Sequence, residues 1–181
     1  ISMGWNATSN GGSEIHIGTE TGVGGSSSNV TNIGIGIRTG QNVTGQSNSA
    51  VGWQAGNQVA GDLNVAMGRM AGTGVAGSSN TALGSYVGKD VTGSSNVALG
   101  DQAGNLVTAD HTVAVGTRAH ASVGDAMAFG RDASATTLGG VALGAASVAS
   151  TDAGTTTKVS GYDPSTGVAS TATNATWRST Q

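Results

Sequence analysis

The residue types that most often perform catalysis or bind metals are few in this chain, and none forms a reactive pattern. The three histidines, His16, His111 and His120, lack the spacing of ligands on one helix face, and no cysteine or dense acidic cluster accompanies them. Serines are plentiful, but no nucleophile elbow or partner base stands beside them. The carboxylates do not recur in the register of a calcium-binding nonapeptide repeat. We therefore expect no catalytic residue, no metal site and no cofactor.

One segment matches a phosphate-binding fingerprint. Residues 72–77 read Gly-Thr-Gly-Val-Ala-Gly, the GxGxxG spacing that holds a dinucleotide when it joins a strand to a helix. No helical pattern follows this segment, and its glycines belong to a repeat that runs through the chain. We interpret them as turn glycines.

The composition excludes a wide globular core. Of 181 residues, 32 are glycine and one is proline, while 9% are charged and 3% aromatic, so few large side chains are available for burial. A disordered chain would contain more charge and proline. The net charge is −3 and the basic residues are scattered, which makes nucleic acid an unsuitable partner.

Features of export and anchoring are also missing from the sequence itself. It contains no apolar run as long as a membrane span and no signal peptide at its start. The lack of cysteine fits an exported protein that avoids disulfides. We expect a fragment of an exported protein whose targeting and anchoring parts lie outside it, and no membrane contact by the fragment.

A glycine-terminated repeat dominates the chain. Its motif is Asn-x-Ala-apolar-Gly, as in residues 64–68. The final glycine recurs after steps of 14 and 18, then five steps of 16 and two of 14, at Gly4, Gly18, Gly36, Gly52, Gly68, Gly84, Gly100, Gly116, Gly130 and Gly144. Ten units therefore cover about residues 1–145.

The spacing within a unit predicts its geometry. Apolar residues alternate at i and i+2, the period of a strand, and Gly, Asn, Ser and Asp clusters separate the short runs as turns do. Each unit is predicted to form one coil of two short strands, with coils stacked about 4.8 Å apart into a rod about 48 Å long. The fold class is thus all-β, a parallel β-solenoid of about ten 14–16-residue coils.

Stacking places equivalent residues in columns. We expect an amide ladder of Asn32, Asn48, Asn64, Asn80 and Asn96. We expect an inward column of Val43, Val59, Val75, Val91, Val107 and Val123. The apolar residues before each glycine, such as Leu83 and Leu99, are assigned to the core. The alanines between them are assigned to a face that a neighbouring chain can approach closely, which suggests self-association with closed symmetry.

Several motif copies resemble a known family. Residues 95–100 (Ser-Asn-Val-Ala-Leu-Gly), 112–116 (Thr-Val-Ala-Val-Gly) and 140–144 (Gly-Val-Ala-Leu-Gly) resemble the Asn-Ser-Val-Ala-Ile-Gly repeat of YadA-like heads in trimeric autotransporter adhesins, the type Vc secretion family. The resemblance implies a left-handed parallel β-roll that associates as a parallel homotrimer. The 14-residue steps match the family period, and we place the two extra residues of the 16-residue steps in the loop before the motif.

The end of the chain departs from the repeat. Residues 146–181 are rich in Thr, Ser and Ala, and Ala175-Thr176-Trp177-Arg178 resembles the tryptophan-ring module that follows the head in some of these adhesins and leads toward neck and stalk. We therefore divide the chain into a head at residues 1–145 and a tryptophan-ring-like segment at residues 146–181.

A candidate ligand surface follows the motif glycines. Trp53, Met70 and Tyr86 stand one or two residues after successive glycines and would form an amphipathic patch if exposed. The alternative is that these side chains fill the gap between subunits.

Three functions are compatible with a repetitive rod to different degrees. The resemblance implies an adhesin head on the bacterial cell surface, outside the outer membrane, that binds collagen, fibronectin, laminin or a host cell surface. The alternative is a structural spacer or self-association element for aggregation or biofilm. An enzyme would need acids clustered on one sheet, and the sequence shows none.

Overall fold

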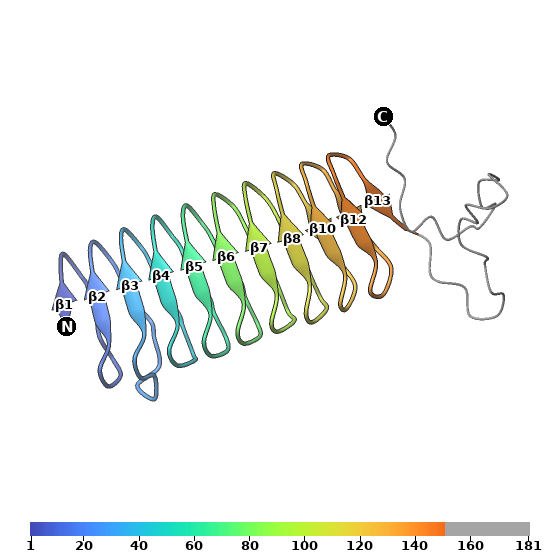
Figure 1. Cartoon of the computed structure of the whole chain (residues 1–181). Coiled ribbons are helices and arrows are strands. Elements are labelled where there is room, and N and C mark those ends of the chain that lie inside the picture. Colours follow the sequence, from blue (N-terminus) through green and yellow to red (C-terminus); the bar gives the residue numbers. More distant parts are fainter. Residues whose placement is uncertain (151–181) are drawn as a thin grey trace, which may run out of the picture.

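The repeat units stack as the coils of a β-solenoid (Figure 1). This computed structural model describes residues 1–150, and no helix occurs among them. Ten of their strands form one parallel sheet along the rod: β1 (Ser2–Met3), β2 (Ile15–Ile17), β3 (Ile33–Ile35), β4 (Ser49–Val51), β5 (Val65–Met67), β6 (Thr81–Leu83), β7 (Val97–Leu99), β8 (Val113–Val115), β10 (Met127–Phe129) and β12 (Val141–Leu143). The all-β solenoid predicted from the repeat is therefore confirmed.

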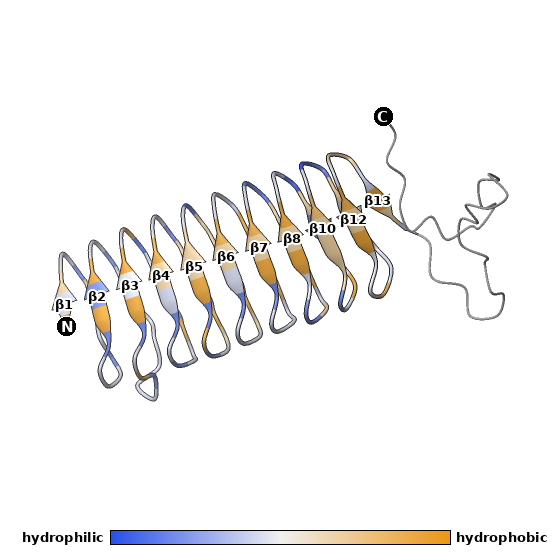
Figure 2. Cartoon of the chain, viewed as in Figure 1, coloured by the Kyte–Doolittle hydropathy of each residue, from blue (hydrophilic) through white to orange (hydrophobic). Residues whose placement is uncertain are grey.

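The register of the sheet follows the motif. Ala82 pairs with Ala98 across a 16-residue step, and Ala128 pairs with Ala142 across a 14-residue step. Differences in repeat length are thus absorbed outside the sheet. Figure 2 shows apolar residues concentrated in the strands and polar residues mainly in the turns that connect them.

The side of the coil opposite this sheet differs between long and short units. Toward its end the described chain forms a second parallel sheet of β9 (His120–Ala121), β11 (Ser134–Ala135) and β13 (Val148–Ala149). In the 16-residue coils turns replace these strands; in one, Gly104 and Leu106 both have a φ of 58°. The prediction of two strands per coil is wrong for the long coils, because two left-handed residues so close together bend the chain.

The two extra residues of a long coil lie in this turn, after the motif glycine. Their expected place in the loop before the motif is wrong, because that loop keeps its conformation in both coil lengths. The residue five before the glycine is left-handed in a long coil (Ser95, φ 59°) and in a short coil (Asp125, φ 59°). The left-handed pair of the long coil, such as Gly88 and Asp90 (φ 57° and 55°), has no counterpart between residues 118 and 125.

The interior of the rod is lined by alanine and not by its larger neighbours. Ala98 in β7 is 5% exposed, whereas Leu99 beside it is only half-buried, as is Leu83 in β6. The assignment of the leucines to the core and the alanines to the outer face is therefore wrong. The cause is the narrow gap between the two walls: a Cβ on Gly72 of the opposite wall would lie 2.8 Å from the Cβ of Ala66. The buried column consists of Ala50, Ala66, Ala82, Ala98, Ala114, Ala128 and Ala142.

A valine column completes the interior on the far side from the sheet. Five of its predicted members are at most 5% exposed and pack as one cluster, namely Val43, Val59, Val75, Val91 and Val107. Their burial confirms the prediction. Val123 is only half-buried, because in its shorter coil Ala121 takes the inward position.

The motif glycines are required by the stacking itself. Their φ angles lie between 113° and 138°, a region that side chains disfavour. A Cβ on Gly84 would lie 2.6 Å from the carbonyl oxygen of Gly100 in the next coil.

The rod extends beyond the boundary predicted at residue 145, since β13 belongs to the second sheet. The tryptophan-ring-like segment predicted at residues 146–181 lies, from residue 151 onward, outside the described residues.

Candidate functional site

The outer face of the ten-stranded sheet carries two rows of mainly apolar side chains, one of them interrupted by Ser49 and Thr81, that the described residues leave partly open. In the three-residue strands of this sheet the first and third residues point outward, while the middle residue points into the rod. Ile35, Met67 and Leu143 are 38%, 48% and 55% exposed. The third-position row consists of Met3, Ile17, Ile35, Val51, Met67, Leu83, Leu99, Val115, Phe129 and Leu143. An apolar face of this length is typical of a surface that packs against another protein.

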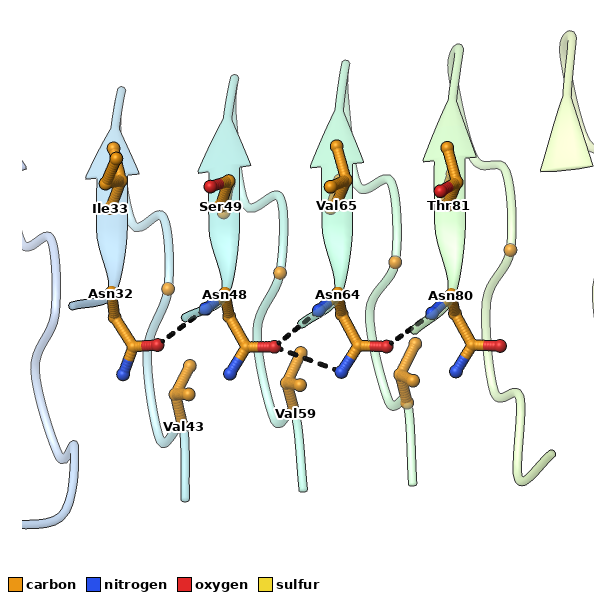
Figure 3. A pocket seen from close by; sticks show the side chains of 18 of the residues that line it. Asn32, Ile33, Val43, Asn48, Ser49, Val59, Asn64, Val65, Asn80 and Thr81 are labelled. Carbon is orange, nitrogen blue, oxygen red and sulfur yellow. Dashed lines mark hydrogen bonds between the residues drawn. The ribbon is translucent and has the colours of Figure 1, made fainter. Parts of the chain in front are cut away.

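The five asparagines expected to form a ladder are buried and linked coil to coil, and Figure 3 shows four of them, Asn32, Asn48, Asn64 and Asn80, in one column beside the strands. The side-chain oxygen of Asn48 accepts a hydrogen bond from the backbone N–H of Asn64 at 2.9 Å, and the oxygen of Asn64 accepts from the N–H of Asn80 at 2.9 Å. The Asn64 amide nitrogen donates to the carbonyl of Gly77 at 2.9 Å. Each side chain therefore joins two coils at two points.

The chemistry of this column differs from a plain amide-to-amide ladder. Among the described residues, one direct amide-to-amide bond occurs, from Asn64 Nδ2 to Asn48 Oδ1 at 3.0 Å. Between the two ends of the column the other contacts bridge side chain and backbone, and so satisfy buried groups that the strand pairing leaves free. Thr112 ends the column and donates its hydroxyl to Asn96 Oδ1 at 2.7 Å. Glu14 begins it and accepts from Asn32 Nδ2 at 3.2 Å.

A narrow cavity runs inside the long coils along this column (Figure 3). Its walls are the asparagine, alanine and valine columns together with glycines such as Gly72. It begins at Glu14 and His16 and ends at Gly104 and Thr112, before the first of the two 14-residue coils that end at Gly130 and Gly144. Apart from the Glu14–His16 pair, its lining is uncharged.

The Glu14–His16 pair is the buried ionisable feature of the second coil. His16 occupies the alanine position of the inner column, where it is 4% exposed, and its Nε2 lies 3.7 Å from Glu14 Oε2. The imidazole fits because the next coil has Gly34 in place of alanine; a Cβ there would lie 2.7 Å from His16 Nδ1. Burial lowers the pKa of His16, and the neighbouring carboxylate offsets this only in part. His16 Nδ1 has no hydrogen-bond partner among the described residues.

Two of the three residues proposed as a ligand surface, Trp53 and Tyr86, flank Arg69, which the sequence analysis did not include in that surface. The guanidinium carbon of Arg69 lies 5.0 Å from the ring centre of Trp53 and 4.9 Å from that of Tyr86. Trp53 is 39% exposed, while Tyr86 and Met70 are half-buried. Its position in the repeat could have indicated it, because Arg69 directly follows the motif glycine Gly68 just as Trp53 directly follows Gly52 in the preceding coil.

The other candidate residues considered in the sequence do not form a catalytic, metal-binding or phosphate-binding site among the described residues. Nδ1 of His111 lies 3.6 Å from Oδ1 of Asp125 on the surface. The side chain of His120, in β9, makes no hydrogen bond or ion pair with the described residues. The glycines of residues 72–77 lie in turns, with φ of 57° at Gly72 and 76° at Gly74. Within residues 1–150 no three His, Cys, Asp or Glu side chains lie close enough together to hold a metal ion. The same residues contain no helix long and apolar enough to cross a membrane.

Comparison of the chain with protein-family models, with curated proteins and with solved structures gave no match.

Proposed function

We propose that this chain is the head fragment of a bacterial surface adhesin of the trimeric autotransporter class. Three left-handed rolls would associate in parallel around one axis and present their outer surfaces to host matrix proteins of the collagen, fibronectin or laminin class, or to a host cell surface. The fragment would stand outside the outer membrane, with its anchor in another part of the protein.

The observation that carries this proposal is the reversal of the usual core. Behind the ten-stranded sheet the walls of the rod are so close that the inward position of the strands is mainly alanine, and larger residues such as Leu83 and Leu99 point outward. Burying these residues is the main source of stability open to a chain with so few large side chains. A second and third copy of the same face, in the same register, would cover the two rows along their whole length.

Repetition also supports adhesion. Parallel copies of one rod would place identical weak sites at fixed distances, so that several bind one fibrous partner together. The second candidate is a spacer or self-association element of the same fibre. It rests on the same outer face, because an apolar surface can also join one rod to another.

Two measurements test the proposal in order. Sedimentation equilibrium of the purified chain should give three times the monomer mass, and Leu99→Asp, which places a charge in the outer row, should shift it to monomer. Asp101→Ala, which lies two residues away outside that row, is the matched control and should stay trimeric. A wild-type chain that is monomeric at micromolar concentration would contradict the proposed trimer.

The adhesive role is tested with the same preparations. Wild-type chain coated on a surface should retain collagen, fibronectin or laminin, and Leu99→Asp should retain much less because avidity is lost. If the coated chain retains only further copies of itself, the spacer function replaces adhesion.

A further inference from the structure

Three side chains from successive coils form a row beside the ten-stranded sheet. The guanidinium of Arg69 lies within 5.0 Å of the ring centres of both Trp53 and Tyr86, close to the spacing of about 4.8 Å between stacked strands. The cation is therefore held between two aromatic groups, one in the coil before it and one in the coil after it. Such contacts restrict the rotamers of an arginine without using its N–H groups.

The charge of Arg69 is not neutralised by the described part of the chain. Arg38 lies 2.6 Å from a carboxylate oxygen of Glu20, and Arg118 lies 2.7 Å from one of Asp132. Arg131 also contacts Asp132, at 3.4 Å. Among residues 1–150 no side-chain hydrogen bond or ion pair involves Arg69, the indole N–H of Trp53 or the hydroxyl of Tyr86, so the row offers free donors around one positive charge.

Part of the backbone of the row is already hydrogen-bonded between coils. The N–H of Met70 donates to the carbonyl of Trp53, and the N–H of Tyr86 donates to that of Arg69, both at 2.8 Å. These groups are therefore unavailable to a peptide that recognises its partner by adding a strand. The row suits a ligand recognised by its anionic groups, with aromatic surface beside them for sugar rings.

We infer that Trp53, Arg69 and Tyr86 form a binding site for the anionic groups of an acidic polysaccharide, an inference that rests on the proposed adhesive function. Arg69 is the specificity-determining residue and forms paired hydrogen bonds with a sulfate or uronate carboxylate. Trp53 and Tyr86 hold the guanidinium in place and contact the neighbouring sugars.

Soluble hexasaccharides separate the two sources of negative charge. Isothermal titration calorimetry of the wild-type chain uses a heparin hexasaccharide for sulfate, a hyaluronan hexasaccharide for carboxylate alone, a neutral dextran hexasaccharide and hexaglutamate. Binding of either anionic sugar above the neutral sugar and above hexaglutamate supports the site and identifies its anion. Equal or tighter binding of hexaglutamate, or no binding of either anionic sugar, overturns it.

Matched variants assign the binding to the row. Arg69→Gln should weaken binding of the anionic sugar about tenfold or more, the loss expected for one charge-assisted contact. Arg38→Gln removes the same charge from an exposed arginine that is already paired with Glu20, and should change binding less than twofold. Arg69→Lys should fall between wild type and Arg69→Gln, because the charge stays while the planar fork is lost. Equal losses in Arg69→Gln and Arg38→Gln would mean general attraction and overturn the site.

Two controls separate this inference from the broader function. Sedimentation equilibrium of Arg69→Gln should match wild type, whereas dissociation would assign the row to a subunit contact and overturn the site. Retention of matrix proteins is measured on the same samples. A chain that retains matrix protein but binds no anionic sugar refutes the polysaccharide site and leaves the proposed adhesive function intact. A chain that binds the anionic sugar but retains no matrix protein supports the site and refutes a matrix protein as the ligand.

Discussion

The asparagine column should be a principal determinant of the stability of the long coils, and Asn64→Ala tests it. The N–H of Asn80 is buried and donates to Asn64 Oδ1 at 2.9 Å, with no other partner among the described residues. Truncation leaves this donor unpaired, at about 1–3 kcal/mol, and the loss of the remaining Asn64 side-chain hydrogen bonds adds about 1 kcal/mol. We expect the free energy of unfolding to fall by about 2–4 kcal/mol per chain.

Denaturant unfolding at fixed protein concentration measures the loss, and amide hydrogen exchange locates it. Exchange at the Asn80 N–H should accelerate, while the N–H of Asn48, which donates to Asn32, should stay protected. Thr92→Ala is the control: this exposed side chain makes no hydrogen bond among the described residues and should cost less than about 0.5 kcal/mol. If Asn64→Ala is as harmless as Thr92→Ala, the column has no stabilising role.

Three further outcomes follow from the same structure. Leu99→Ala should lower the free energy of unfolding of the dissociated chain in urea by less than about 2 kcal/mol, because Leu99 is half-buried. Ala98→Leu should lower it by at least about 3 kcal/mol, because the larger side chain overpacks the interior. The opposite order would mean that the leucines, and not the alanines, form the core. Gly84→Ala should lower the thermal midpoint far more than Gly139→Ala, since both have positive φ but a Cβ at Gly139 meets nothing within 4 Å; equal shifts would rule out the contact between coils. Because burial lowers the pKa of His16, this histidine is protonated at a higher pH in the unfolded chain than in the folded chain. The free energy of unfolding should therefore fall as the pH drops below about 6.5, the pKa of an unperturbed histidine. His16→Ala should remove this pH dependence from unfolding curves recorded between pH 7 and pH 5.

The columns of the rod could be predicted from spacing alone. Successive strands pair in parallel at equivalent motif positions, so residues such as Asn64 and Asn80, or Val75 and Val91, stack wherever the repeat is regular. Strand register and the glycine positions follow from the same periodicity, and the absence of a wide core follows from the composition. The partners of the asparagines did not, because their carbonyl acceptors, such as Gly77, come from loops whose path the repeat length leaves open.

The inside and outside of the rod were decided only by the tertiary structure. Val97-Ala98-Leu99 alternates between two faces, and the alternation is the same whichever face is buried. The distance between the two walls decides which face is buried. Glycines opposite the alanines bring the backbones so close that a side chain larger than alanine does not fit at the inward position of the strand. His16 is accommodated there because the residue stacked on it in the next coil is Gly34 and not alanine. The stacking of Arg69 between two rings depends in the same way on how neighbouring coils superpose, since each residue alone is an ordinary surface side chain and only the spacing of about one strand separation brings the three into contact.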